Sequence, residues 1–431
     1  MDLSRRATAI LGVAALAIGA VTLLPTHTAA AASPGTAGSS GWVASWAASP
    51  MAPTALISAQ AEAGFTDQTV RNIVYTSVGG DAFRVRVSNA FGASPLTVGA
   101  VSVGLVLTGA QLAPDTSHAV TFDGKTSTSV PAGAEVLSDP VPMTVPPLTE
   151  LAISLYLPTS TGPATYHQDA QQTGYVASGD HAADPAATAF TTTTSSWDFV
   201  DGLVTHAPRT PGTVVAFGDS ITDGYQSQAG ANARWPNYLA RRLQAAFGGR
   251  APAVVDEGIS GNRILSPSAC FGVSAETRFA RDALSQPGVK DVILLEGIND
   301  IGQLRTTGPL RAPHAVVSAA QIIAGDKQII REAHAAGLEI IGATLTPFGG
   351  SQRWTAAGEI TREQVNNWIL TSGSFAGVID FARAVADPGD PEALDPAYDS
   401  GDHLHPDGAG YQAMADAISM AMLRGLERRV R

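Results

Sequence analysis

From Thr213 onward, short apolar runs alternate with longer segments of helical periodicity, and this alternation restricts the fold more than any other feature of the sequence. The apolar runs have the length of buried strands. Strands that alternate with helices form a parallel sheet covered by helices on both faces. We therefore predict an α/β fold for this half. The expected strands are 213–218, 254–255, 292–295, 338–345 and 378–381, and the expected helices are 235–247, 321–336, 361–370 and 409–423.

The segment from Trp42 to about His206 has a different pattern. Residues 83–87 alternate apolar and polar side chains, which is typical of a half-buried strand, and Gly- and Pro-containing turns separate several further runs. Short strands between such turns predict an all-β accessory domain over 42–206, either a β-sandwich or a jelly roll. The Thr/Ala-rich stretch 182–196 is expected to be a connector, and residues 211–431 to form the second domain.

The first residues predict export from the cell. Arg5 and Arg6 precede an apolar run, and an alanine-rich stretch follows it. This order is typical of a secretory signal peptide, expected over 1–32 with cleavage near Ala31 or Ala32, followed by a linker over 33–41. An uncleaved anchor is the alternative, and the route, general or twin-arginine, stays open. The mature protein is expected to be secreted and extracellular.

The composition excludes some partners. The chain has 26 Lys+Arg against 38 Asp+Glu and a net charge of -12, with no basic run, so we do not expect nucleic-acid binding. No later apolar run is long enough to span a bilayer, which argues against a stable membrane anchor. Cys270 is the only cysteine and cannot form an intramolecular disulfide. The oligomeric state stays open.

Polar motifs follow the first three predicted strands of the α/β half. Ser220 lies in Gly-Asp-Ser-Ile-Thr-Asp-Gly, Gly261 in Ile-Ser-Gly-Asn, and Asn299 in Gly-Ile-Asn-Asp. In a parallel sheet, these positions lie at the same edge, beyond the carboxyl ends of the strands. Asp402 and His405 precede the last predicted helix, from which they can return to that edge. Topology alone therefore predicts that the five residues converge.

These residue types supply the parts of a serine-based acyl transfer. Ser220 is the predicted nucleophile and His405 its general base, because imidazole exchanges protons near neutral pH. Asp402 is expected to orient the ring. The backbone N–H groups of Ser220 and Gly261 and the side-chain amide of Asn299 are expected to form the oxyanion hole.

Other interpretations of the same residues stay open. Asp399 and Asp407 compete with Asp402 for the histidine. His403 and His405, together with the flanking carboxylates, contain enough N and O ligands for a metal site. Taken singly, Ser220 is also a suitable helix N-cap, and Asn299 a suitable turn residue.

The motifs resemble those of the SGNH, or GDSL-type, hydrolase family, with all four in family order over 213–423. The resemblance implies a three-layer α/β/α fold of the SGNH-hydrolase, flavodoxin-like type, no cofactor and no metal. It also implies Ser220, Gly261, Asn299 and His405 as the family's residues, with Asp402 completing a triad. Asp256 stands where members often carry Asn. The N-terminal half is similar to the β-domain of some secreted actinobacterial esterases.

The expected function is hydrolysis of carboxylic esters of short acyl groups, including acetyl groups on polysaccharides. A lipase or lysophospholipase-type acylhydrolase is the alternative for the substrate, which is expected to be a small molecule, an acylated carbohydrate or a lipid. A second alternative gives the β-domain a carbohydrate-binding role, with Trp42, Trp46 and Tyr75 as candidates, unless these side chains are buried. The segment 346–348 is a candidate pocket wall, and Arg234 with its neighbour tryptophan either lines the acyl pocket or packs a helix.

Overall fold

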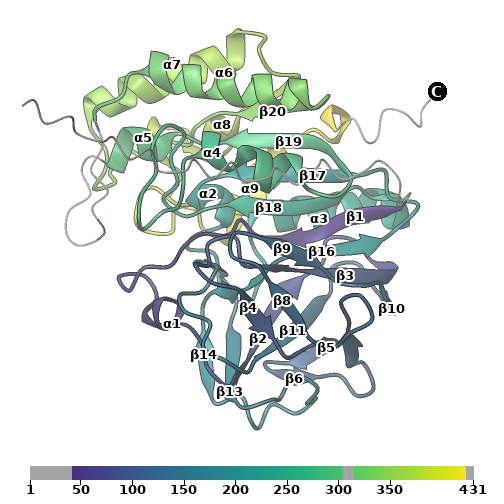
Figure 1. Ribbon diagram of the computed structural model, residues 1–431. Helices are drawn as coiled ribbons and strands as arrows, with labels where there is room; N and C mark the ends of the chain where they lie inside the picture. The colour runs from purple at the N-terminus through teal and green to yellow at the C-terminus, as the bar shows by residue number, and fades with distance from the viewer. Residues whose placement is uncertain (1–40, 304–309, 311–314, 424–431) are drawn as a thin grey trace, which may run out of the picture. The chain divides into compact units, whose positions relative to one another are not determined.

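The computed structural model describes residues 41–303, 310 and 315–423, so the predicted signal peptide and the linker up to residue 40 lie outside the described residues. Five parallel strands form the sheet of the C-terminal half, as the alternating pattern predicts (Figure 1). Across the sheet, their order is β18 (Ala253–Gly258), β17 (Thr213–Gly218), β19 (Val289–Leu295), β20 (Glu339–Ala343) and β21 (Gly377–Ile379).

Helices follow most of these strands. A short antiparallel pair also lies in this half, formed by β22 (Ala386–Asp387) and β23 (Asp390–Leu394). The α-helices are α2 (Ser220–Asp223), α3 (Trp235–Phe247), α4 (Ala275–Phe279), α5 (Ile298–Gly302), α6 (Ala319–Ala335), α7 (Ala356–Thr371), α8 (Phe381–Val385) and α9 (Gly408–Ala417), and single turns of 3-10 or π helix cover Gly248–Arg250, Ala280–Leu284 and Met420–Met422.

Alternate residues of β17 pack on opposite faces of the sheet. Val214 and Ala216 belong to the apolar cluster that includes α3 and α9. Val215 and Phe217 belong to a second cluster, which includes α4 and α6. Because successive side chains of a strand point to opposite faces, a sheet buried on both sides has a continuous apolar sequence, as residues 213–217 do. The result is the three-layer α/β/α arrangement.

The N-terminal half, here called the β region (42–206), contains antiparallel strands in two main sheets, and side chains from both fill one apolar core. This arrangement is a β-sandwich. The first sheet contains β1 (Trp42–Ala47), β16 (Val200–His206), β3 (Gly80–Ser88), β10 (Val141–Val145) and β9 (Glu135–Leu137); the second contains β14 (Thr192–Thr194), β13 (Gly174–Ser178), β2 (Gln68–Tyr75), β11 (Glu150–Leu157), β5 (Ala100–Thr108), β6 (Gln111–Leu112) and β7 (His118–Val120); β12 (Tyr166–His167) pairs with β15 (Trp197–Asp198), β4 (Leu96–Val98) pairs with β8 (Thr128–Val130), and α1 covers Ala59–Ala63.

Several element boundaries differ from the sequence prediction: β20 is shorter than the strand expected over 338–345, and α7 begins before the helix expected over 361–370. Two further differences have an identifiable cause. The strand expected over 378–381 ends at Ile379, because the Asp380 carboxylate accepts the Arg383 N–H and starts α8. The helix expected over 409–423 ends at Ala417, where Arg242 donates to the carbonyl oxygens of Ala415 and Ile418. A side-chain donor on the last carbonyls takes the place of the missing helical N–H groups.

The β region contacts the α/β half directly. Ala44 of β1 donates its N–H to the Pro287 carbonyl at 2.9 Å, and Ala44 and Ala47 belong to the same apolar cluster as Val215 of β17. Cys270, the only cysteine of the sequence, is buried. Among the described residues, no helix combines the length and the apolar character needed to cross a membrane.

Candidate active site

Ser220 is the first residue of α2, which follows β17 after a single residue. That residue, Asp219, caps the helix by accepting the Ile221 N–H at 2.9 Å. Glycine is required at position 218, because a Cβ there would lie 2.3 Å from the Leu295 carbonyl oxygen. The Gly-Asp-Ser sequence therefore folds into a tight strand-to-helix turn with Ser220 at the carboxyl end of β17.

A chain of hydrogen bonds joins Ser220, His405 and Asp402. Oγ of Ser220 lies 2.8 Å from Nε2 of His405, and Nδ1 of the same ring lies 2.6 Å from Oδ2 of Asp402. Oδ1 of Asp402 accepts the backbone N–H groups of Leu404 at 2.9 Å and His405 at 2.8 Å. Partial burial would raise the pKa of Asp402, but the His405 ring and these N–H groups hold it well below its ordinary value. An ionised Asp402 keeps Nδ1 protonated and leaves Nε2 free to accept a proton from Ser220.

The two competing carboxylates have other partners. Asp399 accepts from Nδ1 of His403 at 2.5 Å. Asp407 caps α9 by accepting the N–H groups of Ala409 and Gly410, each at 2.9 Å. Of the three acidic residues, Asp402 is therefore the one that contacts the His405 ring.

The same contacts bear on the metal interpretation. The metal interpretation requires His403, His405, Asp402 and Asp407 as ligands, but these residues take part in three separate hydrogen-bonding arrangements. His403 pairs with Asp399, His405 pairs with Asp402, and Asp407 caps α9. Over the ranges that the structure describes, no group of three or more His, Cys, Asp or Glu side chains has an arrangement that could hold a metal ion.

The three residues predicted to form the oxyanion hole are buried, and the N–H groups concerned have no acceptor in the described part of the protein. Asn299 is the second residue of α5 and is 1% exposed, and its Nδ2 has no hydrogen-bond partner in the described part of the chain. In the same described ranges, the backbone N–H groups of Ser220 and Gly261 donate to no protein acceptor. Gly261 has φ 78°, and a Cβ there would lie 2.4 Å from Cδ1 of Phe271, so both backbone conformation and space require glycine.

Arg353 fixes the Asn299 side chain and was not predicted from the sequence. Its Nη1 donates to Oδ1 of Asn299 at 2.8 Å, which assigns the oxygen to the arginine side and leaves the amide nitrogen facing away from it. Burial lowers the pKa of Arg353, while Asp219 and Asp402 raise it. The loop after β20 therefore contributes to the site through Arg353, whereas Phe348 of the expected pocket wall is fully buried in the core.

Tyr225 packs against the histidine on the exposed side of the site. Its ring centroid lies 4.8 Å from that of His405 at an interplanar angle of 62°, and the residue is 37% exposed. Burial raises the pKa of Tyr225, as do the negative charges of Asp169 and Asp402, and Arg353 lowers it. Asp169, Asp402 and Arg353 are therefore close enough to Tyr225 to change its pKa.

Arg234 and Trp235 pack the fold and do not contact Ser220. Trp235, the first residue of α3, is fully buried, with its ring 5.5 Å from that of Phe381. Arg234 donates to the Asp223 carbonyl at 2.5 Å and lies 3.7 Å from Asp256. Burial raises the pKa of Asp256 to about 7, although Arg234 opposes the shift.

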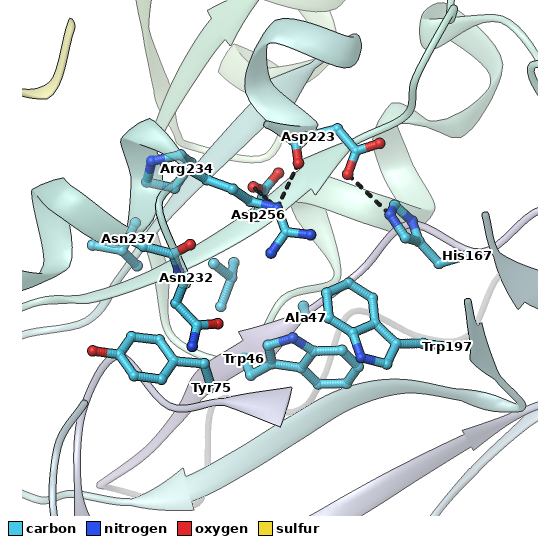
Figure 2. Close-up of a pocket in the computed structure, with 13 residues that line it drawn as sticks. Trp46, Ala47, Tyr75, His167, Trp197, Asp223, Asn232, Arg234, Asn237 and Asp256 are labelled. Carbon is cyan, nitrogen blue, oxygen red and sulfur yellow. Dashed lines mark hydrogen bonds and ion pairs between the residues drawn. The ribbon is translucent and has the colours of Figure 1, made fainter. Parts of the chain in front are cut away.

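A small cavity lies next to the end of α2 (Figure 2). It is lined by the charged residues Asp223, Arg234 and Asp256 and by Trp46, Tyr75 and His167 of the β region. Its volume of about 20 Å³ holds no more than a water molecule. Trp46 is 6% exposed, so it belongs to the core and is unavailable for carbohydrate binding. Trp42 packs on His206 with ring centroids 5.3 Å apart, and the Arg241 guanidinium lies 5.8 Å from the centre of the Tyr75 ring.

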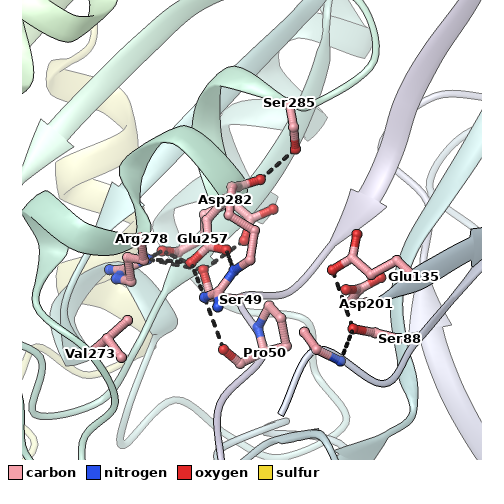
Figure 3. Close-up of polar contacts among 12 residues, drawn as sticks. Ser49, Pro50, Ser88, Glu135, Asp201, Glu257, Val273, Arg278, Asp282 and Ser285 are labelled. Atoms are coloured by element: carbon pink, nitrogen blue, oxygen red, sulfur yellow. Dashed lines mark hydrogen bonds and ion pairs between the residues drawn. The ribbon is translucent and has the colours of Figure 1, made fainter. Parts of the chain in front are cut away.

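A buried arginine forms hydrogen bonds with the ends of β17 and β18, the strands that precede Ser220 and Gly261. Arg278 donates to the carbonyl oxygens of Gly218 at 2.7 Å and Glu257 at 2.8 Å, and to Oδ1 of Asn262 at 2.8 Å. It also donates to Oγ of Ser49, in the β region, at 2.9 Å (Figure 3). The ends of β17 and β18 therefore share one charged contact, and Arg278 and its partner Ser49 are 229 positions apart in the sequence.

The order of these elements and motifs agrees with a known family. Residues 216–413 match the GDSL-like Lipase/Acylhydrolase family. Members of this family are esterases, and the match covers slightly less than half of the chain. The C-terminal half is therefore similar to this family, and the protein is an ester hydrolase. No curated protein sequence gives a significant match to the chain.

Solved structures similar to the chain include other hydrolases. A lipase/acylhydrolase from Enterococcus faecalis is 21% identical, with 51% of this chain and 96% of that chain covered and a TM-score of 0.37. An acetyl xylan esterase from Geobacillus stearothermophilus is 22% identical (48% and 93% covered, TM-score 0.37), and an aryl esterase from M. smegmatis is 15% identical (48% and 95% covered, TM-score 0.37). The similarity to the GDSL-like family rests on the family match and on the sheet that carries the motifs.

Proposed function

We propose that the protein is a secreted serine esterase in which Ser220 attacks the ester, His405 transfers protons and Asp402 orients His405. The observation that carries this proposal is the continuous hydrogen-bond chain from Ser220 Oγ through the His405 ring to the Asp402 carboxylate. This arrangement is the one in which a weakly acidic hydroxyl becomes a nucleophile at neutral pH.

The chemistry proceeds through an acyl-enzyme. As Oγ of Ser220 bonds to the acyl carbon, its proton moves to Nε2 of His405, and the carbonyl oxygen becomes an oxyanion. The tetrahedral species collapses by breaking the bond to the alcohol oxygen, which takes the proton from His405. A water molecule then gives a proton to His405 and attacks the acyl carbon, and the second collapse returns the proton to Ser220 and releases the carboxylic acid.

The oxyanion is proposed to be bound by the backbone N–H groups of Ser220 and Gly261 and by Nδ2 of Asn299. The buried and unpaired Nδ2 supports this role, because a buried donor without a partner is rare unless a ligand completes it. Removing one such donor typically costs about 3 kcal/mol of transition-state stabilisation.

The proposed substrate is an ester of a short acyl group, such as acetate, on a polar alcohol such as a polysaccharide hydroxyl. The charged residues around Tyr225, which are Asp169, Arg353 and Asp402, support a polar rather than a lipid partner. A long acyl chain needs extended apolar surface to replace its contact with water. Of the large hydrophobic side chains that are exposed in the described part of the chain, Tyr225 is the one that packs on His405.

Hydrolysis of p-nitrophenyl esters from acetate to palmitate, by the protein and by S220A, tests this proposal. Activity on short chains that disappears in S220A and is unaffected by a chelator is expected, together with acetate release from acetylated xylan. Activity that survives S220A, or that a chelator removes, contradicts the serine mechanism. A maximum at palmitate supports the lipase alternative instead.

The secretion proposal has its own test. Residues 1–32 have the charge and apolar pattern of a signal peptide, and N-terminal sequencing of the protein from the culture medium is expected to begin near Ala32 or Ser33. Protein that keeps residues 1–32 and stays with the cells would contradict it.

A further inference from the structure

The N–H of Gly261 belongs to the same peptide group as the carbonyl of Ser260. A trans peptide is planar, and its C=O and N–H point in opposite directions, so whatever holds the carbonyl also aims the N–H. Gln168 of the β region donates from Nε2 to the Ser260 carbonyl oxygen at 3.1 Å in a buried contact, although it lies 92 positions earlier in the chain. A donor from the β region therefore acts on the peptide whose N–H is the proposed oxyanion donor.

The orientation of the Gln168 amide follows from its neighbours. Nε2 faces two acceptors, the Ser260 carbonyl and, at 3.3 Å, Oδ2 of Asp169, so the nitrogen and not the oxygen points to the loop. Gln168 is 6% exposed, and its Oε1 is buried without a partner in the described part of the chain. An unpaired buried oxygen is unfavourable. Gln168 therefore keeps one buried oxygen unpaired while its nitrogen donates to the Ser260 carbonyl.

A second set of contacts connects the same loop to the β region through Asp223 of α2. Oδ2 of Asp223 accepts the N–H of Ser260 at 3.1 Å and its Oγ–H at 2.8 Å. Oδ1 of Asp223 lies 3.0 Å from Nε2 of His167 (Figure 2). Nδ1 of the same ring lies 3.0 Å from the Ser49 carbonyl oxygen. Both ring nitrogens face acceptors, and only the imidazolium form donates to both. Burial would lower the pKa of His167, but Asp223 and the Ser49 carbonyl raise it above its ordinary value.

We infer that Gln168, supported by the His167–Asp223 pair, is a positioning residue that aims the Gly261 N–H at the oxyanion. Donation to the Ser260 carbonyl also polarises that peptide and strengthens its N–H as a donor. The inference rests on the proposed function of Ser220, and it makes the β region part of the support of the catalytic site rather than a separate module.

The full-length variant Q168M removes the donor at nearly constant volume. The matched control is Q244M, because Gln244 of α3 also donates across to the β region, to the Ser77 carbonyl at the same distance of 3.1 Å. With p-nitrophenyl acetate, we expect Q168M to lower kcat about tenfold, with KM within about twofold, whereas Q244M stays within about twofold in both. Melting temperatures of the two variants are expected to be similar.

A second variant distinguishes positioning from simple destabilisation. In Q168E, the carboxylate faces the Ser260 carbonyl and repels it, whereas the protonated carboxyl donates to it. The activity of Q168E relative to the parent protein is therefore expected to rise several-fold as the pH falls from about 8 to about 5.5. Q244E supplies the control and is expected to show no such rise.

The outcomes separate this inference from the proposed function. If S220A is inactive but Q168M matches Q244M in kcat, or the relative activity of Q168E does not change with pH, the positioning role is wrong and the serine mechanism stands. If S220A remains active, the serine mechanism fails and the positioning role fails with it. If Q168M does not fold, the pH dependence of Q168E decides the matter.

Discussion

Replacing Arg353 with methionine tests how the site holds its side-chain oxyanion donor. Arg353 Nη1 donates to Oδ1 of Asn299 at 2.8 Å. The amide nitrogen, Nδ2, has no hydrogen-bond partner among the described residues. Without this bond, the carboxamide can rotate and present its oxygen in place of its nitrogen. Hydrogen bonds to charged groups are worth about 1.5–3 kcal/mol, so R353M is expected to lower kcat about 10- to 100-fold.

A double-mutant cycle shows whether Arg353 acts through Asn299. N299A deletes the donor and is expected to lower kcat about 100- to 1000-fold. Once the amide is absent, the arginine has nothing left to orient, so the R353M/N299A pair is expected to have about the same kcat as N299A alone. The assay is saturation kinetics with p-nitrophenyl acetate on the four full-length proteins, with thermal melts to verify that each is folded.

The refuting result is additivity. If the loss in the double variant equals the product of the two single losses, Arg353 acts independently of Asn299, for example on the charge of the substrate, and the orienting role is wrong. R353K separates charge from geometry: the ammonium keeps the positive charge but lacks the planar fork, so only partial recovery of kcat is expected.

Three further predictions concern individual groups. D402N is expected to lower kcat by about 10³–10⁴-fold, whereas D399N, which changes the neighbouring carboxylate, stays within about threefold; equal losses would deny Asp402 its role. G261A is expected to lose at least about 100-fold in kcat/KM and to melt earlier, because its methyl group clashes with Phe271 at φ 78°. Burial raises the pKa of Asp198 to about 7, so its protonated form contributes stability below the unfolded pKa of about 3.9, and that contribution is lost as the pH rises through about 7. D198N is therefore expected to melt about 2 °C above the parent near pH 8 and no higher near pH 5; a gain independent of pH would contradict the reasoning.

The sequence predicts the parallel sheet because each strand is buried on both faces. Residues 213–217 and 292–295 are continuous apolar runs, and the helices between the strands have clear periodicity. The two boundaries with an identified cause depend on single side chains: Asp380 acts within its own segment, whereas Arg242 is far away in the sequence. Arg242 ends α9 from a position more than 170 residues earlier, and no local pattern around Ala417 indicates this.

The site divides in the same way. The positions of Ser220, Gly261 and Asn299 follow from short motifs directly after strands, and strand topology brings them to one edge. Arg353 and Gln168 lie in irregular segments and contact the site at sequence separations of 54 and 92. The sequence around Arg353 and around Gln168 has no periodicity or motif that indicates a role in the site. Only the folded chain identifies them.

The buried charges explain why both halves of the chain matter to one site. Arg278 has no exposed side-chain surface, and a buried charge that loses a partner costs several kcal/mol. Its donors go to the ends of β17 and β18 and to Ser49 of the β region. The network is therefore complete only when the β region is in place. The groups proposed to react belong to the α/β half of the chain, but the loops that carry Ser220 and Gly261 are also held by contacts from the β region. The precision of the site therefore depends on the β-sandwich.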